Sequence, residues 1–304
     1  MLNRFTYRDI TWVDLESPTD GELYDIIDEF SVIPPVAQEL KTPSLKPKVD
    51  LYKDFIYLIL HFPAFKHSHI SGSNQEVDFI IGDKFLITVH YDTIDPIHKF
   101  SKEFEVESIL EKHDLGNHAG FIFFHLIKKL YRSLEHELEY VASELDEIED
   151  AIFIGKEKEV VKFISEVSRD LLNFKQATGS HQEVLNSLEM VSKKFFGGDF
   201  DYFIKDIMSE YYKVDKTIGN HRESLLELRD TNNSLLSTKQ NETMKVLSIL
   251  AFVTFPLSLV ASIFGMNTAY LPIVGGNNDF WTIIGIMGIL TLLFFFYFRH
   301  KEWL

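Results

Sequence analysis

The sequence contains no cysteine among its 304 residues. Disulfide bonds and thiolate metal sites are therefore excluded, and any divalent cation must be bound by oxygen or imidazole ligands. Such ligands favour hard cations, although they also bind zinc. The opening stretch, MLNRFTYRDITWVDL, lacks an apolar core of signal-peptide length, so we expect the first domain to stay in the cytoplasm.

Basic residues are scarce as well. The chain has 46 Asp and Glu against 30 Lys and Arg, which gives a formal net charge of −16. An acidic surface argues against nucleic-acid partners, which need basic stripes. An enzyme is the least favoured class, because the sequence shows no Gly-rich phosphate loop, no HExxH motif and no nucleophile paired with a base.

Charged residues almost disappear near the end of the chain. From Val246 to Phe298 the only one is Asp279. Two uncharged segments, about 246–266 and 280–298, are each long enough to cross a hydrocarbon core of roughly 30 Å as a helix. The sequence therefore predicts two membrane spans joined by a short loop, 267–279.

The flanks of these spans predict their orientation. Lys239 and Lys245 precede the first span, Arg299 and Lys301 follow the second, and the loop has neither lysine nor arginine. The positive-inside rule then places both termini in the cytoplasm and the loop outside.

The chain before the spans divides by pattern into mixed and helical regions. Residues 1–116 are expected to form an α/β domain, with strand-like segments at 48–62 and 76–90 and helix-like segments at 21–30 and 35–40. Residues 117–198 are expected to form a helical hairpin, with helical character running from about 156 to 195 before the pair Gly197-Gly198.

Apolar residues at coiled-coil spacing mark two seams. In the hairpin they step by 4 and 3, at Leu134, Leu138, Val141, Leu145, Ile148 and Ile152. In the last helix the seam is Val214, Ile218, His221, Leu225, Leu228, Asn232 and Leu235. We expect a single helix from about 200 to 264, close to 100 Å long at about 1.5 Å per residue, which suits a rod that carries motion into a membrane.

One face of the first span is mostly small or polar. At helical spacing it comprises Asn241, Met244, Ser248, Ala251, Phe255, Ser258, Ser262 and Gly265. Membrane helices commonly pack through small residues, so a two-helix anchor is one interpretation of this face. The other is a water-lined pore made by several copies, which Asn241 and Asn267 at its two ends favour.

The tripeptide Gly265-Met266-Asn267, placed after the first span and followed by a short loop, a second span and the tail RHKEWL, resembles the CorA family of divalent-cation channels. The segments KPKVDLYKDFIYLIL (46–60) and NETMKVLSILAFVTFPLSLVASIFGMN (241–267) carry the resemblance, which covers essentially the whole chain. It implies a funnel-shaped homopentamer in the inner (plasma) membrane. The expected parts are an α+β cytoplasmic domain (1–116), the hairpin (117–198), a stalk helix continuing into the first span (199–266), the outer loop (267–279), the second span (280–298) and a basic cytoplasmic tail (299–304).

The resemblance also implies roles for individual residues. Gly265, Met266 and Asn267 would form the selectivity filter, and the pore would be lined by Asn241, Met244, Leu247, Ala251, Phe255, Ser258 and Ser262. At one position the two patterns differ: the family pattern gives Leu247 as pore-lining, whereas the helical spacing gives its neighbour Ser248. Mg²⁺, with Co²⁺ and Ni²⁺, would be taken up down the electrochemical gradient. Mg²⁺ bound between cytoplasmic domains would close the channel, with Asp206 and Asp54 as candidate ligands.

The outer mouth departs from the usual family pattern. Thr268 replaces an aromatic residue after the tripeptide, and the loop reads Leu271-Pro272-Ile273-Val274, which lacks the glutamate often found there. Phe255 and Ser262 stand where methionine and glycine are common. Ion capture and selectivity are therefore expected to differ from those of better-known members.

Two alternatives remain open. A zinc transporter of the ZntB type shares the architecture but typically alters the middle residue of the tripeptide, whereas Met266 keeps the magnesium-type form; His61, His67 and His69 could suggest a zinc site. A membrane-anchored coiled-coil scaffold without conductance is the second alternative.

Overall fold

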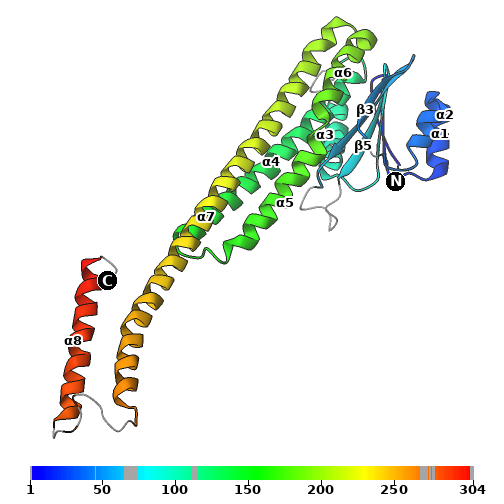
Figure 1. Ribbon diagram of the computed structural model, residues 1–304. Coiled ribbons are helices and arrows are strands. Elements are labelled where there is room, and N and C mark those ends of the chain that lie inside the picture. Colours follow the sequence, from blue (N-terminus) through cyan, green and yellow to red (C-terminus); the bar gives the residue numbers. More distant parts are fainter. Residues whose placement is uncertain are drawn as a thin grey trace. The chain divides into compact units, whose positions relative to one another are not determined.

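The structure is a computed structural model of the chain (Figure 1). It describes residues 2–44, 46–64, 74–110, 116–267, 273, 275 and 278–301, without the side chains of 107–110. The chain forms two compact units, residues 1–229 and 230–304.

The first unit is built on a six-stranded sheet. Its strands are β1 (Leu2–Tyr7), β2 (Ile10–Glu16), β3 (Lys48–Leu51), β4 (Phe55–Phe62), β5 (Gln75–Gly82) and β6 (Phe85–His90). Their order is β1-β2-β6-β5-β4-β3, and only β2 and β6 pair in parallel. The predicted strand segments 48–62 and 76–90 are confirmed, each as a hairpin of two strands.

Two short helices cover one face of the sheet, α1 (Asp20–Phe30) and α2 (Pro34–Glu39). Thr19 starts α1 with a capping box: its hydroxyl accepts from the Glu22 N–H, and Glu22 Oε2 accepts from the Thr19 N–H at 2.8 Å. Leu23 and Ile26 are buried with Ile80 and Ile87 of the sheet in one apolar cluster. The predicted helices 21–30 and 35–40 are therefore confirmed: α1 starts one residue earlier and ends as predicted, and α2 starts and ends one residue earlier.

Longer helices cover the other face, where aromatic side chains join the layers. These helices are α3 (Asp95–Leu110) and α4 (Gly120–Phe153). The ring of Trp12 on β2 lies 5.3 Å from Phe100 of α3, and Phe79 on β5 lies 5.3 Å from Phe123 of α4. Such ring contacts bury large apolar areas and hold each helix at a fixed position on the sheet.

The sequence pattern missed one break in the helical hairpin. The helical character expected from about 156 to 195 is confirmed, but it is divided between two helices, α5 (Val160–Thr178) and α6 (His181–Phe196), with Gly179 at the end of α5. A short 3-10 turn, η1 (Gly198–Phe200), then leads into the long helix. The break matters because it brings His181 into the core beneath β4.

Helix α7 (Asp201–Phe264) is a single helix of 64 residues, as predicted. Every member of the predicted α4 seam is buried, and on α7 Val214 and Ile218 are fully buried. The polar seam residue His221 donates from Nε2 to the Leu138 carbonyl at 3.1 Å, while Asn232 is 1% exposed. Both seams are thus real packing surfaces.

The second unit contains the end of α7 and the helix α8 (Asp279–His300). Both helices are long and apolar enough to cross a membrane, and within one chain their most apolar windows are unburied. Pro256 lies inside α7 without ending it. The ring of Phe252 on α7 lies 6.4 Å from that of Phe298 on α8.

Candidate pore and metal sites

The predicted pore-lining residues lie along the last part of α7. Met244, Leu247 and Phe255 are 55%, 54% and 72% exposed in the single chain. Asn241, Ser258 and Ser262 are also exposed, whereas Ala251 is half-buried. Leu247 is exposed and Ser248 is half-buried, so Leu247 is the more available of the two for contact with other copies.

The predicted filter begins where α7 ends. The Gly265 N–H still donates to the Ala261 carbonyl at 2.9 Å, and the Met266 N–H donates to Ile263 at 3.3 Å. Asn267 follows as an exposed residue outside the helix. A Cβ at Gly265 would lie only 3.1 Å from the Ala261 carbonyl oxygen, so glycine allows this tight exit from the helix.

The outer loop is described only in part. Thr268, Leu271, Pro272 and Val274 lie outside the described residues. The loop's acid, Asp279, accepts a hydrogen bond from the Gly275 N–H at 2.5 Å and opens the first turn of α8. A negative side chain at a helix N-terminus is stabilised by the helix dipole, which gives Asp279 a structural role at this position.

Asp206, the first candidate regulatory ligand, is ion-paired within its own chain. Lys128 Nζ of α4 lies 2.6 Å from Asp206 Oδ2 and 3.4 Å from Glu210 Oε1. Burial alone raises the pKa of Glu210, but hydrogen bonds from Lys213 and Lys128 outweigh it, so this pKa lies below its usual range. A cation that binds Asp206 must therefore compete with the Lys128 ammonium.

Asp54, the second candidate, is exposed in the turn between β3 and β4. The turn is closed by the Tyr52 N–H, which donates to the Phe55 carbonyl at 2.9 Å. Among the described residues no three His, Asp or Glu side chains come together in a group that could hold a metal ion. Asp206 and Asp54 therefore belong to no such group within the described part of one chain.

The histidine pattern does not form a zinc site in the described part of the chain. His67 and His69 lie outside the described residues. His61 is engaged: its Nε2–H donates to the Ser44 carbonyl at 3.0 Å and to Glu76 Oε2 at 3.1 Å. Burial lowers the pKa of His61, but these hydrogen bonds outweigh it and the pKa is raised.

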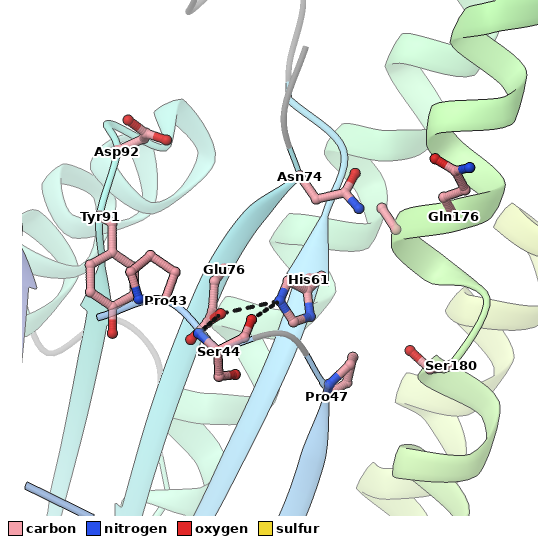
Figure 2. Close-up of a pocket in the computed structure, with 11 residues that line it drawn as sticks. Pro43, Ser44, Pro47, His61, Asn74, Glu76, Tyr91, Asp92, Gln176 and Ser180 are labelled. Atoms are coloured by element: carbon pink, nitrogen blue, oxygen red, sulfur yellow. Dashed lines mark hydrogen bonds and ion pairs between the residues drawn. The ribbon is translucent and has the colours of Figure 1, made fainter. Parts of the chain in front are cut away.

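The sequence analysis missed a polar cavity of about 340 Å³ beside His61 (Figure 2). It lies where the loop after α2, strands β4, β5 and β6, and the α5–α6 turn come together. Its buried acid, Glu76, stands two residues before Asp78, and both are on one face of β5. Two acids alternating within the buried strand QEVDFIIG are the sequence signal that could have pointed to it.

Comparison with known proteins identifies one family. A family model described as "CorA-like Mg²⁺ transporter protein" matches residues 7–300. The cobalt/magnesium transport protein CorA of Methanocaldococcus jannaschii is 24% identical over 100% of this chain and 95% of its own length.

Solved structures show the same fold. The complete CorA magnesium transporter of Methanocaldococcus jannaschii superposes with a TM-score of 0.85 at 22% identity, covering 100% of this chain and 95% of that one. The cytoplasmic domain of ZntB from Vibrio parahaemolyticus gives 0.63 at 11% identity, covering 76% of this chain and 89% of that one. The match to the complete CorA structure therefore extends over the whole of this chain, including the helices α7 and α8.

Proposed function

This chain belongs to the CorA family, and we propose that it is a channel that carries Mg²⁺, and also Co²⁺ and Ni²⁺, into the cytoplasm. The relative named as a cobalt/magnesium transport protein, aligned over the whole chain, supports this choice of ions. The observation that carries the proposal is Asn267, which lies exposed immediately after the uncharged part of α7.

Asparagine suits the outer end of such a pore. Mg²⁺ holds six waters tightly and loses them reluctantly. A ring of neutral amide oxygens can hydrogen-bond to that water shell without holding the ion too strongly. Conduction needs sites that are favourable enough to enter and weak enough to leave, which a ring of carboxylates would be less able to provide.

The pore requires several copies of the chain, because two membrane helices cannot enclose a channel. We propose a homopentamer in the inner (plasma) membrane, with five copies of α7 around the axis and both termini in the cytoplasm. The unburied apolar windows of α7 and α8 leave surface for lipid and for neighbouring copies. A divalent ion crossing 100 mV gains about 4.6 kcal/mol, so no ATP is needed.

The apolar side chains of Met244, Leu247 and Phe255 form the proposed constriction. Five large apolar residues around a narrow axis can close it by excluding water. Regulation by Mg²⁺ would come from ions bound between neighbouring cytoplasmic domains at Asp206 and Asp54, and opening would follow loss of those ions.

Ion flux into liposomes loaded with a Mg²⁺-sensitive dye tests the channel and its two functional positions. Asn267→Ala should reduce Mg²⁺ uptake by more than tenfold, because the outer hydration-shell contacts are lost. Phe255→Ala should raise the leak measured at high internal Mg²⁺, because the constriction widens. Leu250→Ala, exposed on the opposite side of α7, serves as the matched control and should leave both unchanged.

The same liposomes separate the alternatives. Uptake of Zn²⁺ in preference to Mg²⁺ and Co²⁺ would indicate a zinc transporter, for which the ZntB fold match is the supporting observation. No uptake of any of these ions, with Asn267→Ala indistinguishable from the parent chain, would indicate a non-conducting scaffold.

A further inference from the structure

The polar cavity beside His61 is lined by oxygen-bearing side chains from separate elements. Glu76 and Ser44 lie deep, and Asn74, Asp92 and Gln176 lie at exposed positions around it (Figure 2). None of the lining residues that the structure describes is lysine or arginine. A concave site that gathers carboxylate, amide and hydroxyl oxygens, with His61 as the one basic side chain among the described lining residues, is suited to a hard, positively charged ligand.

Glu76 is the side chain that points to a ligand. Its side chain is 2% exposed, and Oε2 accepts from the Ser44 N–H at 2.7 Å and from His61 Nε2–H at 3.1 Å. Within the described part of the chain, Oε1 is buried without any hydrogen-bond partner. A buried carboxylate oxygen left unpaired costs on the order of a few kcal/mol, so the site is incomplete as it stands.

Asp78 adds a second carboxyl group beside Glu76 on the same face of β5. Its side chain is fully buried, and its Oδ1 also lacks a hydrogen-bond partner among the described residues. Two neighbouring buried carboxyl groups therefore each present an oxygen without a donor.

Ser44 adds a further polar group to the cavity. The hydroxyl oxygen of Ser44 is buried and has no partner in the described residues either. A cavity of about 340 Å³ has room for several waters at roughly 30 Å³ each. Water is therefore expected against Ser44, and the charge of Glu76 determines which ion can accompany that water.

We propose that this cavity binds one hydrated divalent cation within a single subunit. Glu76 supplies the charge, and Ser44, Asn74 and Gln176 hold waters of the ion's shell. Mg²⁺ typically keeps several waters and uses only one or two carboxylates. This mode agrees with the lack, among the described residues, of a three-ligand group of His, Asp and Glu.

The bound ion would join two layers of the first unit. Glu76 belongs to the start of β5, Asn74 directly precedes this strand, and Gln176 belongs to the last turn of α5. The site uses neither Asp206 nor Asp54 and needs no neighbouring subunit. It is thus separate from the regulatory sites proposed above and does not depend on the chain being a channel.

Metal binding by the full chain in detergent tests the proposal, with Mn²⁺ as an EPR-visible probe. The parent for the comparison carries Asp206→Asn and Asp54→Asn, which removes the proposed intersubunit ligands. In this background Glu76→Gln should abolish one Mn²⁺ site per chain or weaken it at least tenfold. The near-isosteric amide retains an oxygen that can accept from the Ser44 N–H.

A second variant guards against misfolding of the first. Gln176 is exposed, so Gln176→Ala should fold normally and weaken the same site severalfold. Gln182→Ala, exposed on α6 and away from the cavity lining, is the matched control and should bind Mn²⁺ like the parent.

Hexaamminecobalt(III), an inert analogue of a hexahydrated ion, should displace Mn²⁺ from this site. Unchanged Mn²⁺ stoichiometry and affinity in both Glu76→Gln and Gln176→Ala would overturn the proposal and leave a cavity that holds water only. Failure of hexaamminecobalt(III) to compete would overturn the hydrated mode of binding. Either result leaves the flux measurements on Asn267 unaffected.

Discussion

His181 shows how one buried residue joins the layers of the first unit. Its Nε2–H donates to the His61 carbonyl of β4 at 2.7 Å, and its Nδ1 accepts from the Tyr131 hydroxyl of α4 at 2.8 Å. The contact with Tyr131 needs the neutral ring, because a protonated Nδ1 cannot accept a hydrogen bond. Burial lowers the pKa of His181 to about 4, and the hydrogen bond to His61 offsets only part of this.

This histidine should make the fold sensitive to acid. The pKa in the folded chain lies below the unfolded value of roughly 6.5, so the stabilisation is complete above pH 6.5. It is lost as the pH falls from about 6.5 towards 4, by up to about 3 kcal/mol. The thermal midpoint of the detergent-solubilised chain, followed by near-UV circular dichroism, should fall across this range.

Substitution separates this effect from other titrating groups. His181→Gln can accept from Tyr131 and donate to His61, and it should flatten the fall in midpoint between pH 6.5 and 4. Tyr131→Phe keeps the histidine and should retain the steep dependence. Equal pH slopes in the parent and His181→Gln would contradict the assignment.

At the level of elements, the contact between α4 and α7 bears on regulation. Lys128 neutralises Asp206 across this contact, and its side chain is only 16% exposed. Lys128→Met removes the ammonium and keeps an apolar stem of similar length. If Asp206 binds regulatory Mg²⁺, half-inhibition of flux should then occur at about fivefold lower Mg²⁺, which corresponds to roughly 1 kcal/mol of ion pairing.

The neighbouring lysine provides the control for this experiment. Lys129 of α4 pairs with Glu103 at 2.7 Å, so Lys129→Met should leave the Mg²⁺ dependence unchanged. Asp206→Asn should shift the dependence the other way, towards weaker inhibition. Equal Mg²⁺ dependence in Lys128→Met and Lys129→Met would argue that Asp206 is not a regulatory ligand.

Features that depend on residues close together in the sequence were predicted more accurately than features that depend on contacts between distant segments. The boundaries of α7 were predictable because an apolar seam and an uncharged span follow each other without a stop. The break between α5 and α6 was missed because Gly179 is a weak signal and the start of α6 depends on burying His181 against β4. Strand β2 lacks clean alternation, since it pairs with β6 and is buried on both faces.

The same difference between local and long-range signals separates the two candidate sites. The α7 stripe is a periodicity within one helix, so the sequence alone predicts it. The cavity around Glu76 depends on the register of β4 with β5, where His61 stands opposite Glu76, and on the packing of α5 beside them. No spacing of residues along the chain indicates that these segments lie together. The two acids Glu76 and Asp78 are nevertheless unusual in a buried strand.

At the scale of the whole molecule, the polar stripe of α7 is the strongest argument for assembly. Hydroxyls off the stripe are satisfied by their own helix: Thr254 donates to the Leu250 carbonyl at 2.6 Å, and Thr291 donates to Met287 at 2.8 Å. The polar stripe residues within the span, Ser248, Ser258 and Ser262, would have no contact with water if they faced lipid. Several copies that turn the stripe towards a common water-filled axis restore that contact.

The lack of native cysteine makes this arrangement directly measurable. Ser258→Cys introduces one thiol per chain on the stripe, and oxidation in membranes should give disulfide-linked dimers because the thiols meet around the axis. Leu250→Cys, 64% exposed on the opposite side, should stay uncrosslinked. Native mass spectrometry of either unoxidised protein should give a mass about five times 35.4 kDa. Crosslinking at Leu250 but not at Ser258 would place the wrong face of α7 at the axis and would contradict the proposed pore.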